Sequence, residues 1–445
     1  MAELYDLILK NAQVYLPGGL ARLDVGVMGG QIAALEACLD PAKAEVVREL
    51  TGLTILPGFI DSQVHFREPG MEHKEDLATG ATAAVCGGIT SVFEMPNTNP
   101  TTTTEAALND KLARAAGRMA CDHAFFVGAS ADNIDQIAYL EDLPGSAGIK
   151  VFMGSSTGTL LVEREDLLEE VLRRGHRRAS FHSEDEDMLR ANYAKVAAGT
   201  PVREHPYIRS VEAAVTSTKR LLRLAEKTKR LVHVLHISTA EELPLLAANR
   251  AWATCEVLPN HLFLAGPEAY DRLGSKAQMN PPVRDQRHQD ALWAAVNSGL
   301  IDVMGSDHAP HTLEEKAKPF PASPSGMPGV QTTVPLMLNA VTQGRLSLAR
   351  LVDLMASGPQ RIFGIQNKGR LAPGYDADFT IVDLKRTQSV TSTWLKSRAG
   401  WSPYLGEVLT GWPVMTYVRG HLAAEEGERV GTPQGAPVKF LTLRS

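Results

Sequence analysis

Short apolar runs alternate with helix-like stretches through the middle of the chain, and most of the runs end in polar residues. The Ala-rich segment 74–85, for example, follows the first run and predicts a helix. Strands that alternate with helices favour parallel βαβ units, and eight of them predict a (β/α)8 TIM-type barrel, an α/β fold. The eight predicted strands are 53–61, 89–95, 123–127, 147–153, 178–181, 231–235, 254–258 and 301–304.

Both ends of the chain have a different pattern. Residues 1–52 and 369–445 alternate apolar and polar positions between turn residues, which predicts short antiparallel strands. We expect the two ends to pair into one small composite β-sandwich. The predicted domains are therefore 1–52, the N-terminal part of the sandwich; 53–368, the catalytic barrel; and 369–445, the C-terminal part of the sandwich.

Residues 318–329 interrupt the pattern after the eighth strand. They are too rich in proline and glycine to form a helix or a strand, so they predict a long loop. A loop in this position suits a substrate-contacting or lid element.

Composition narrows the function classes. The 445 residues carry a formal net charge of −6, which gives no electrostatic reason to bind nucleic acid or an anionic membrane. No apolar run is long enough to span a bilayer, and the acidic N-terminus lacks the basic start of a signal peptide. The four cysteines are widely spaced without a CxxC pair, so we expect neither a zinc ribbon nor a disulfide framework, and a cytoplasmic location.

Candidate chemistry lies where the predicted strands end, the face at which such barrels place their active sites. His65, His182 and His236 follow three strands, and Asp307 follows the last. Imidazoles with a carboxylate can hold a hydrolytic metal and leave a position open for water. Gln63 points to the same side of its strand as His65, where a second imidazole would complete a metal pincer.

Lys150 stands in the middle of an apolar strand. A buried free ammonium is costly unless it is paired or loses its charge. Two explanations remain open: an ion pair with a neighbouring carboxylate, or a carbamate formed with CO2, whose two oxygens can bridge two cations.

Arg67, Asn97 and Asn280 lie on loops at the mouth of the predicted barrel. Arginine suits bidentate carboxylate binding, which points to an anionic small-molecule substrate. The alternative for Arg67 is an ordinary surface ion pair.

Motifs along nearly the whole chain resemble the dihydroorotases of the amidohydrolase superfamily. The matching stretches are 57–70, 94–98, 182–185, 236–239, 279–284, 306–311 and 374–378. The resemblance implies a metal-dependent cyclic amide hydrolase that reversibly interconverts N-carbamoyl-L-aspartate and L-dihydroorotate in de novo pyrimidine biosynthesis. It also agrees with a barrel carrying a composite sandwich.

The resemblance assigns roles to the site residues. It implies one or two metal ions, the first held by positions 63 and 65, Lys150 and Asp307, the second by Lys150, His182 and His236, with a carbamate on Lys150 as the bridge. The ligand chemistry makes Zn²⁺ the default, with manganese and cobalt as alternatives. Asp307 would carry the proton as catalytic base and acid. Arg67, Asn97 and His311 would bind the substrate carboxylate, and Asn280 the ring.

Two positions depart from the family pattern. Gln63 replaces a ligand histidine, so its own role as a ligand is open, and Asn260-His261 stands where two histidines are common. The change at Gln63 leaves open a non-catalytic relative that acts as a partner of aspartate transcarbamoylase. A separate alternative to a dihydroorotase is another cyclic amidase, of the hydantoinase or allantoinase type. We expect a homo-oligomer, with aspartate transcarbamoylase as a candidate partner.

Overall fold

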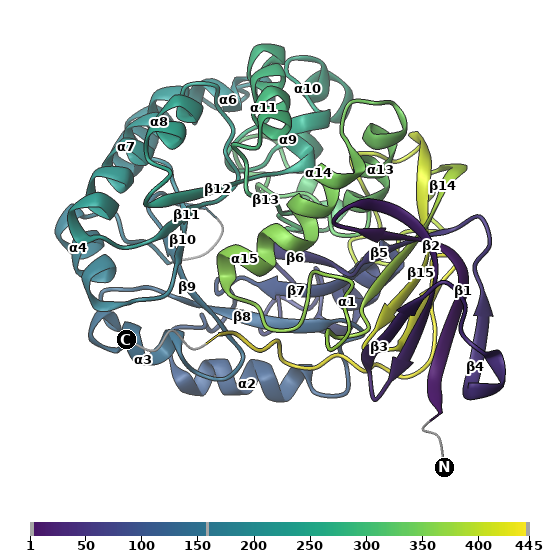
Figure 1. Ribbon diagram of the computed structural model, residues 1–445. Helices are drawn as coiled ribbons and strands as arrows, with labels where there is room; N and C mark the ends of the chain where they lie inside the picture. Colours follow the sequence, from purple (N-terminus) through teal and green to yellow (C-terminus); the bar gives the residue numbers. More distant parts are fainter. Residues whose placement is uncertain (1–3, 157–159, 442–445) are drawn as a thin grey trace.

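Eight parallel strands form a barrel in the order of the chain, with helices outside it (Figure 1). The computed structural model describes residues 4–156 and 160–441. The barrel strands are β6 (Phe59–Val64), β7 (Ile89–Glu94), β8 (Asp122–Gly128), β9 (Ser146–Phe152), β10 (Ala179–His182), β11 (Val232–Val234), β12 (Ala253–Val257) and β13 (Val303–Met304). The predicted fold class is confirmed.

The barrel closes between its first strand and the segment after its last. Val64 at the end of β6 forms a parallel bridge with His308. The backbone N–H of His65 donates to the carbonyl of His308 at 2.7 Å. Because this contact lies at the carboxyl end of both strands, it brings residues 63–67 against residues 307–311.

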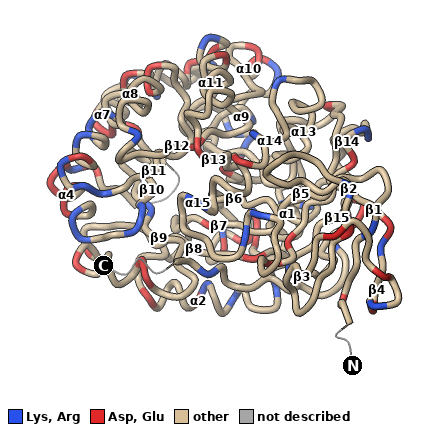
Figure 2. The backbone as a smooth tube through the Cα atoms, in the orientation of Figure 1, with Lys and Arg blue, Asp and Glu red and all other residues tan. Residues whose placement is uncertain are grey.

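The outer helices begin with local signals. The side chain of Asp76 caps the helix that follows β6 by accepting from the Thr79 N–H at 2.8 Å. Basic and acidic residues both lie along the outer helices (Figure 2). Arg223–Glu165 and Lys227–Glu169 ion pairs join two of these helices at 2.6 and 2.8 Å. The α-helices are α1 (Leu77–Cys86), α2 (Glu105–Ala115), α3 (Ile137–Glu141), α4 (Glu165–Arg174), α5 (Glu186–Tyr193), α6 (His205–Ile208), α7 (Val211–Thr228), α8 (Glu242–Ala248), α9 (Pro259–Phe263), α10 (Glu268–Leu273), α11 (Gln286–Ser298), α12 (Leu313–Lys316), α13 (Thr333–Thr342), α14 (Leu348–Val352) and α15 (Gly358–Phe363). None of these helices is both long and apolar enough to cross a bilayer.

A second sheet is built from both ends of the chain, as predicted, and lies beside the barrel (Figure 1). Its strands are β1 (Tyr5–Leu16), β2 (Gly19–Met28), β3 (Gln31–Glu36), β4 (Ala44–Glu49), β5 (Thr54–Pro57), β14 (Phe379–Ser389), β15 (Val408–Val418), β16 (His421–Glu425) and β17 (Glu428–Arg429). The N-terminal and C-terminal strands join where β5 pairs with β1 on one side and β14 on the other. One continuous hydrogen-bonded sheet therefore ties the two termini together.

The single strand predicted over 53–61 is wrong, because the chain forms two strands there. β5 belongs to the terminal sheet and β6 to the barrel, with Gly58 between them. A Cβ at Gly58 would lie 2.4 Å from the Thr90 hydroxyl oxygen and 2.6 Å from the Asp378 Cβ. Only glycine fits this crossing. The apolar run hides it because both strands are fully buried.

The segment 390–407 between β14 and β15 packs onto the loops at the carboxyl ends of the barrel strands. The Trp401 indole N–H donates to the His311 carbonyl at 2.8 Å, and the Tyr404 hydroxyl donates to the Asn260 side-chain oxygen at 2.8 Å. Both aromatic rings belong to an apolar cluster with Met279 and Met327. The C-terminal part of the chain thus supports the loops that carry the candidate site.

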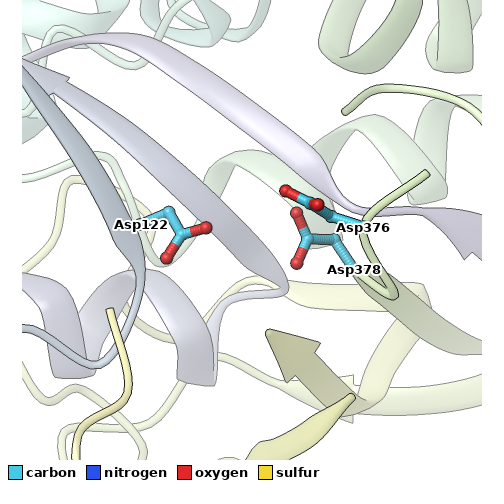
Figure 3. Close-up of side chains that lie close together, drawn as sticks. All are labelled: Asp122, Asp376 and Asp378. Atoms are coloured by element: carbon cyan, nitrogen blue, oxygen red, sulfur yellow. The ribbon is translucent and has the colours of Figure 1, made fainter. Parts of the chain in front are cut away.

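A buried ion-pair network joins the opposite end of the barrel to the terminal sheet. Asp122 begins β8, and Asp376 and Asp378 precede β14; their carboxylates face one another (Figure 3). They are the one group of three or more potential metal-ligating side chains that cluster this closely in the described residues. The Lys368 ammonium lies 2.6, 2.9 and 2.7 Å from these three carboxylates, and Arg419 is 2.8 Å from Asp122. Two of the protein's own cations therefore offset most of the charge of this acidic group.

Lys368→Met should destabilise the fold by about 3–5 kcal/mol, because it leaves buried carboxylates without their main counter-charge. Urea unfolding of the variant and of wild type measures the difference. The matched control is Lys385→Met, which removes the same charge from an exposed position. A loss below about 1 kcal/mol, the range of a surface pair, would contradict a structural role for the network.

Candidate active site

Six candidate side chains gather at the carboxyl-terminal edge of the barrel, as the strand ends predict. Gln63 lies on β6 and His65 directly follows it. Lys150 comes from β9 and His182 from β10, while His236 and Asp307 follow β11 and β13. None of the six residues is more than 8% exposed. Protein groups, and not bulk water, therefore surround these side chains.

The candidate ligands form two close pairs. His65 Nε2 lies 3.1 Å from Asp307 Oδ1, and His182 Nδ1 lies 3.1 Å from His236 Nε2. Two ligands of one tetrahedral zinc, each bonded at about 2.0–2.1 Å, lie roughly 3.3 Å apart. Both pairs thus have the spacing of neighbouring ligands on a single ion.

Second partners orient two of the imidazoles. His65 Nδ1 donates to the Asn97 side-chain oxygen at 2.8 Å, and His182 Nε2 donates to Glu184 at 2.9 Å. The lone pair of His65 Nε2 then faces the Asp307 carboxylate, an arrangement of two acceptors that a cation between them would stabilise. Burial lowers the pKa of His65 and of His182, so both rings are neutral and able to ligate.

Lys150 has no ion pair or hydrogen bond from its ammonium nitrogen within residues 4–156 and 160–441; the nitrogen lies 4.5 Å from the centre of the Phe152 ring. Burial lowers the pKa of Lys150 to about 7, opposed by the charges of Asp307 and Glu256. The ion-pair explanation is therefore wrong for this lysine. Near neutral pH much of the amine is uncharged, which is the form that reacts with CO2.

The amide of Gln63 leaves one polar atom without a partner. Its Nε2 donates to Asp307 Oδ1 at 3.2 Å, while its buried Oε1 accepts no hydrogen bond from the described residues. A buried polar atom without a partner is costly, and a bound group would satisfy it. The donor set therefore fits a divalent cation.

A cationic subsite borders the ligand pairs. The Arg67 guanidinium is buried, its Nε donates to the Pro310 carbonyl at 3.2 Å, and no carboxylate of the described residues lies within 4.0 Å of it. Burial lowers the pKa of Arg67 to about 10, so it stays charged at neutral pH. The surface ion-pair alternative for Arg67 is wrong. His311, also fully buried, lies 3.3 Å from Arg67 Nη2.

Three of these residues have backbone φ angles that residues other than glycine rarely adopt. Arg67, His236 and Asp307 have φ values of +66°, +39° and +45°. Left-handed backbone at residues other than glycine is uncommon, and it clusters at functional sites where the surrounding structure enforces it.

Asn280 and the predicted loop 318–329 both accept hydrogen bonds from histidine side chains. The Asn280 side-chain oxygen accepts from His205 Nε2 at 3.1 Å, so His205, which lies outside every sequence motif, supports this residue. The predicted loop 318–329 is irregular throughout, and its Ser325 carbonyl accepts from His311 Nε2 at 3.0 Å. Lys316 anchors the loop by donating to the carbonyls of Pro324 and Gly326, at 2.8 and 3.1 Å.

Glu256 is a site neighbour that sequence reasoning missed. It stands on β12, is completely buried, and its Oε2 accepts from the Ser62 hydroxyl at 3.1 Å. Its Oε1 has no hydrogen-bond partner among the described residues. Burial, together with the charge of Asp307, raises the pKa of Glu256 to about 8. The available signal was a single carboxylate within an otherwise apolar strand.

The pKa of Glu256 predicts a pH-dependent stability difference from Glu256→Gln. Between the unfolded pKa near 4.5 and the folded value of about 8, the native state binds more protons than the unfolded state. The contribution of Glu256 to stability therefore falls as pH rises through this window, whereas glutamine does not titrate.

The stability of wild type relative to Glu256→Gln should drop by on the order of a few kcal/mol from pH 5 to pH 8. Urea unfolding of both proteins at the two pH values measures it. The exposed Glu45→Gln change should show no such trend. A constant difference between wild type and Glu256→Gln would mean that Glu256 is ionised throughout.

Comparison with known proteins agrees with this fold and site. Residues 54–422 match the amidohydrolase family. The dihydroorotase of Methanosarcina mazei is 35% identical over 431 residues, which cover 94% of each chain. The dihydroorotase of Pyrococcus furiosus is 38% identical over 414 residues, 92% of this chain and 91% of that protein. The chain belongs to the amidohydrolase family.

Solved structures define its class more narrowly. The L-hydantoinase (dihydropyrimidinase) from Arthrobacter aurescens superposes with a TM-score of 0.92 at 31% identity, covering 98% of this chain and 100% of that one. The dihydropyrimidinase from Brevibacillus agri has a TM-score of 0.91 at 26% identity, covering 98% and 99%. Sequence relatives and structural neighbours together make the chain a cyclic amidohydrolase.

Proposed function

We propose that this protein is a dihydroorotase, which reversibly closes N-carbamoyl-L-aspartate to L-dihydroorotate. The observation that carries the proposal is the buried Arg67 guanidinium, which has no carboxylate partner among the described residues and lies beside a set of hydrolytic ligands. A neutral cyclic amide offers no group for this charge, whereas the carboxylate of dihydroorotate does. Relatives named dihydroorotase support the same choice.

The proposed cofactor is zinc, as one or two ions. His65, Asp307 and the free oxygen of Gln63 would hold one ion, and His182 and His236 the other, with a carbamate on Lys150 between them. A bound divalent cation supplies Lewis-acid polarisation of the amide carbonyl and lowers the pKa of water. The unpartnered Gln63 Oε1 and the spacing of the two ligand pairs support this assignment.

The protein's own side chains would position the substrate and move its proton. Arg67 and His311, with Asn97 nearby, would bind the carboxylate, and Asn280 would contact the ring. Asp307 would accept the proton of the attacking water and return it to the leaving nitrogen, as general base and then general acid. Its place against His65 on one side and near the cationic subsite on the other suits both steps.

A second candidate activity is that of the structural neighbours, the hydrolysis of neutral rings such as hydantoin. A third possibility is a silent partner of aspartate transcarbamoylase. The gathered ligands argue against silence, because a scaffold needs none of them.

Arg67→Met should raise KM for L-dihydroorotate about 10- to 100-fold, because a charged hydrogen-bonding group contributes about 1.5–3 kcal/mol. Turnover of hydantoin, where wild type has any, should change less than threefold. Ring-opening assays with both substrates measure this. Arg67→Lys, which keeps the charge but loses the fork of donors, is the matched control. Its KM for L-dihydroorotate should lie between those of wild type and Arg67→Met. Wild type that opens hydantoin but not dihydroorotate would overturn the proposal.

Lys150→Met should lower bound zinc and abolish turnover, because it removes the group proposed to join the two ligand pairs. Metal content by mass spectrometry and activity in zinc and bicarbonate report this.

Gln63→His should bind zinc more tightly than wild type. Should only Gln63→His turn over, the defect lies at that ligand. Should neither wild type nor Gln63→His turn over, the amidase or scaffold alternatives take precedence.

We also propose a homo-oligomer in the cytoplasm, with aspartate transcarbamoylase as a candidate partner. The four free cysteines support a reducing compartment. Light scattering on the purified protein and co-elution with the transcarbamoylase test the two assemblies.

A further inference from the structure

The imidazole of His311 is enclosed by donors on both of its nitrogen atoms. The Lys74 ammonium lies 3.1 Å from Nδ1, while the Ser325 carbonyl lies 3.0 Å and Arg67 Nη2 3.3 Å from Nε2. The ring is completely buried. Lys74 belongs to none of the ligand pairs, and the proposed reaction leaves it without a role.

The chemistry of these groups fixes which nitrogen carries the proton. An ammonium has three donors and no acceptor, so Nδ1 must be the acceptor of the Lys74 contact. A neutral imidazole then carries its hydrogen on Nε2, which donates to the Ser325 carbonyl. Burial and the charges of Arg67, Lys74 and Lys316 lower the pKa of His311 well below its ordinary value, so the ring is neutral.

The opposite tautomer has a weaker partner. Glu315 Oε2 lies 3.5 Å from Nδ1, the long limit for a hydrogen bond, and it already accepts from the Thr312 N–H at 3.1 Å. The other oxygen of Glu315 accepts from Lys74 at 3.1 Å. Glu315 therefore holds the Lys74 ammonium in place rather than taking the His311 proton.

Two donors consequently stand side by side. His311 Nε2–H and the Arg67 Nη2 group are both donors, so their 3.3 Å contact is not a hydrogen bond between them. Two parallel donors at this separation suit one carboxylate, which accepts on both of its oxygens. The Ser325 carbonyl from loop 318–329 occupies part of this position.

We propose that Lys74 is a positioning residue that holds His311 in the Nε2–H tautomer, so that His311 and Arg67 present paired donors to the carboxylate of an anionic cyclic amide. The inference rests on the proposed function, in which Arg67 and His311 bind that carboxylate. Lys74 does not touch the substrate. It acts through the imidazole and so determines preference for acidic over neutral rings.

The first test is the tautomer of His311 in the resting protein. Long-range ¹H–¹⁵N correlation spectra of ¹⁵N-histidine-labelled protein distinguish the two ring nitrogens, and His311→Gln assigns the signal. We expect hydrogen on Nε2 in wild type and in Lys74→Arg, and a shift toward hydrogen on Nδ1 in Lys74→Met. Hydrogen on Nδ1 in wild type overturns the proposal, whether or not the variants fold.

The second test is kinetic. Lys74→Met should raise KM for L-dihydroorotate about 10-fold or more, the effect of losing a donor to a charged group, with kcat within threefold of wild type. Lys74→Arg should recover most of the loss, and Lys385→Met, an exposed control of equal charge change, should behave as wild type. An equal fall in kcat for both Lys74 variants would indicate a merely structural role and overturn the proposal.

The two tests separate this inference from the proposed function. If wild type does not open dihydroorotate, the proposed function fails. The role of Lys74 in carboxylate binding then fails as well, even if His311 has the expected tautomer. If wild type turns over but Lys74→Met keeps its KM, only the inference about Lys74 fails.

Discussion

The site depends on one backbone contact, the hydrogen bond by which the His65 N–H meets the His308 carbonyl and closes the barrel. Without it, the segment after β6 and the segment after β13 would be neighbours only through the other six strands. With it, His65 lies against Asp307, and Arg67 lies against Pro310 and His311. A parallel barrel closes only when its first and last strands pair, so the constraint that completes the fold also assembles both the ligand pair and the cationic subsite.

That closure also accounts for the backbone strain. Arg67 and Asp307, on the two sides of the junction, both have positive φ values. Each costs free energy that an isolated loop would not retain. Here the surrounding contacts hold both residues in place. The Pro310 carbonyl accepts from the Arg67 side chain, and Gln63 donates to Asp307, which His65 also contacts. The Trp401 indole donates to the His311 carbonyl. The C-terminal segment 390–407 thus stabilises a site whose residues lie far away in sequence.

What the sequence could predict follows from the range of each interaction. Strand ends are local features, so the polar residues at or just after the ends of β6, β10, β11 and β13 form a set that the sequence shows, and the positions of His65, His182, His236 and Asp307 agree with it. The separation of β5 from β6 was not visible, because both are buried and the glycine between them matters only through Thr90 and Asp378. Lys74 and His311 are 237 positions apart, and no periodicity links them. Contacts of that kind depend on how loops pack, which a pattern of apolar positions does not encode.

Three buried lysines show how the same side chain serves structure in one place and chemistry in another. Lys368 lies among three carboxylates, which raise its pKa and keep it charged, so it joins barrel and sheet. Lys316 donates to backbone carbonyls and fixes a loop. Lys150 has neither kind of partner within the described residues, only an aromatic ring and two carboxylates that act at a distance. Burial lowers the pKa of Lys316 to about 7, as it does for Lys150, but the Lys316 nitrogen donates to three backbone carbonyls. The difference between the two lysines is therefore one of partners and not of pKa. A buried amine without such partners, among candidate metal ligands, is a candidate reactive group. This is the physical reason to propose a role in the reaction for Lys150 and a structural role for Lys368 and Lys316.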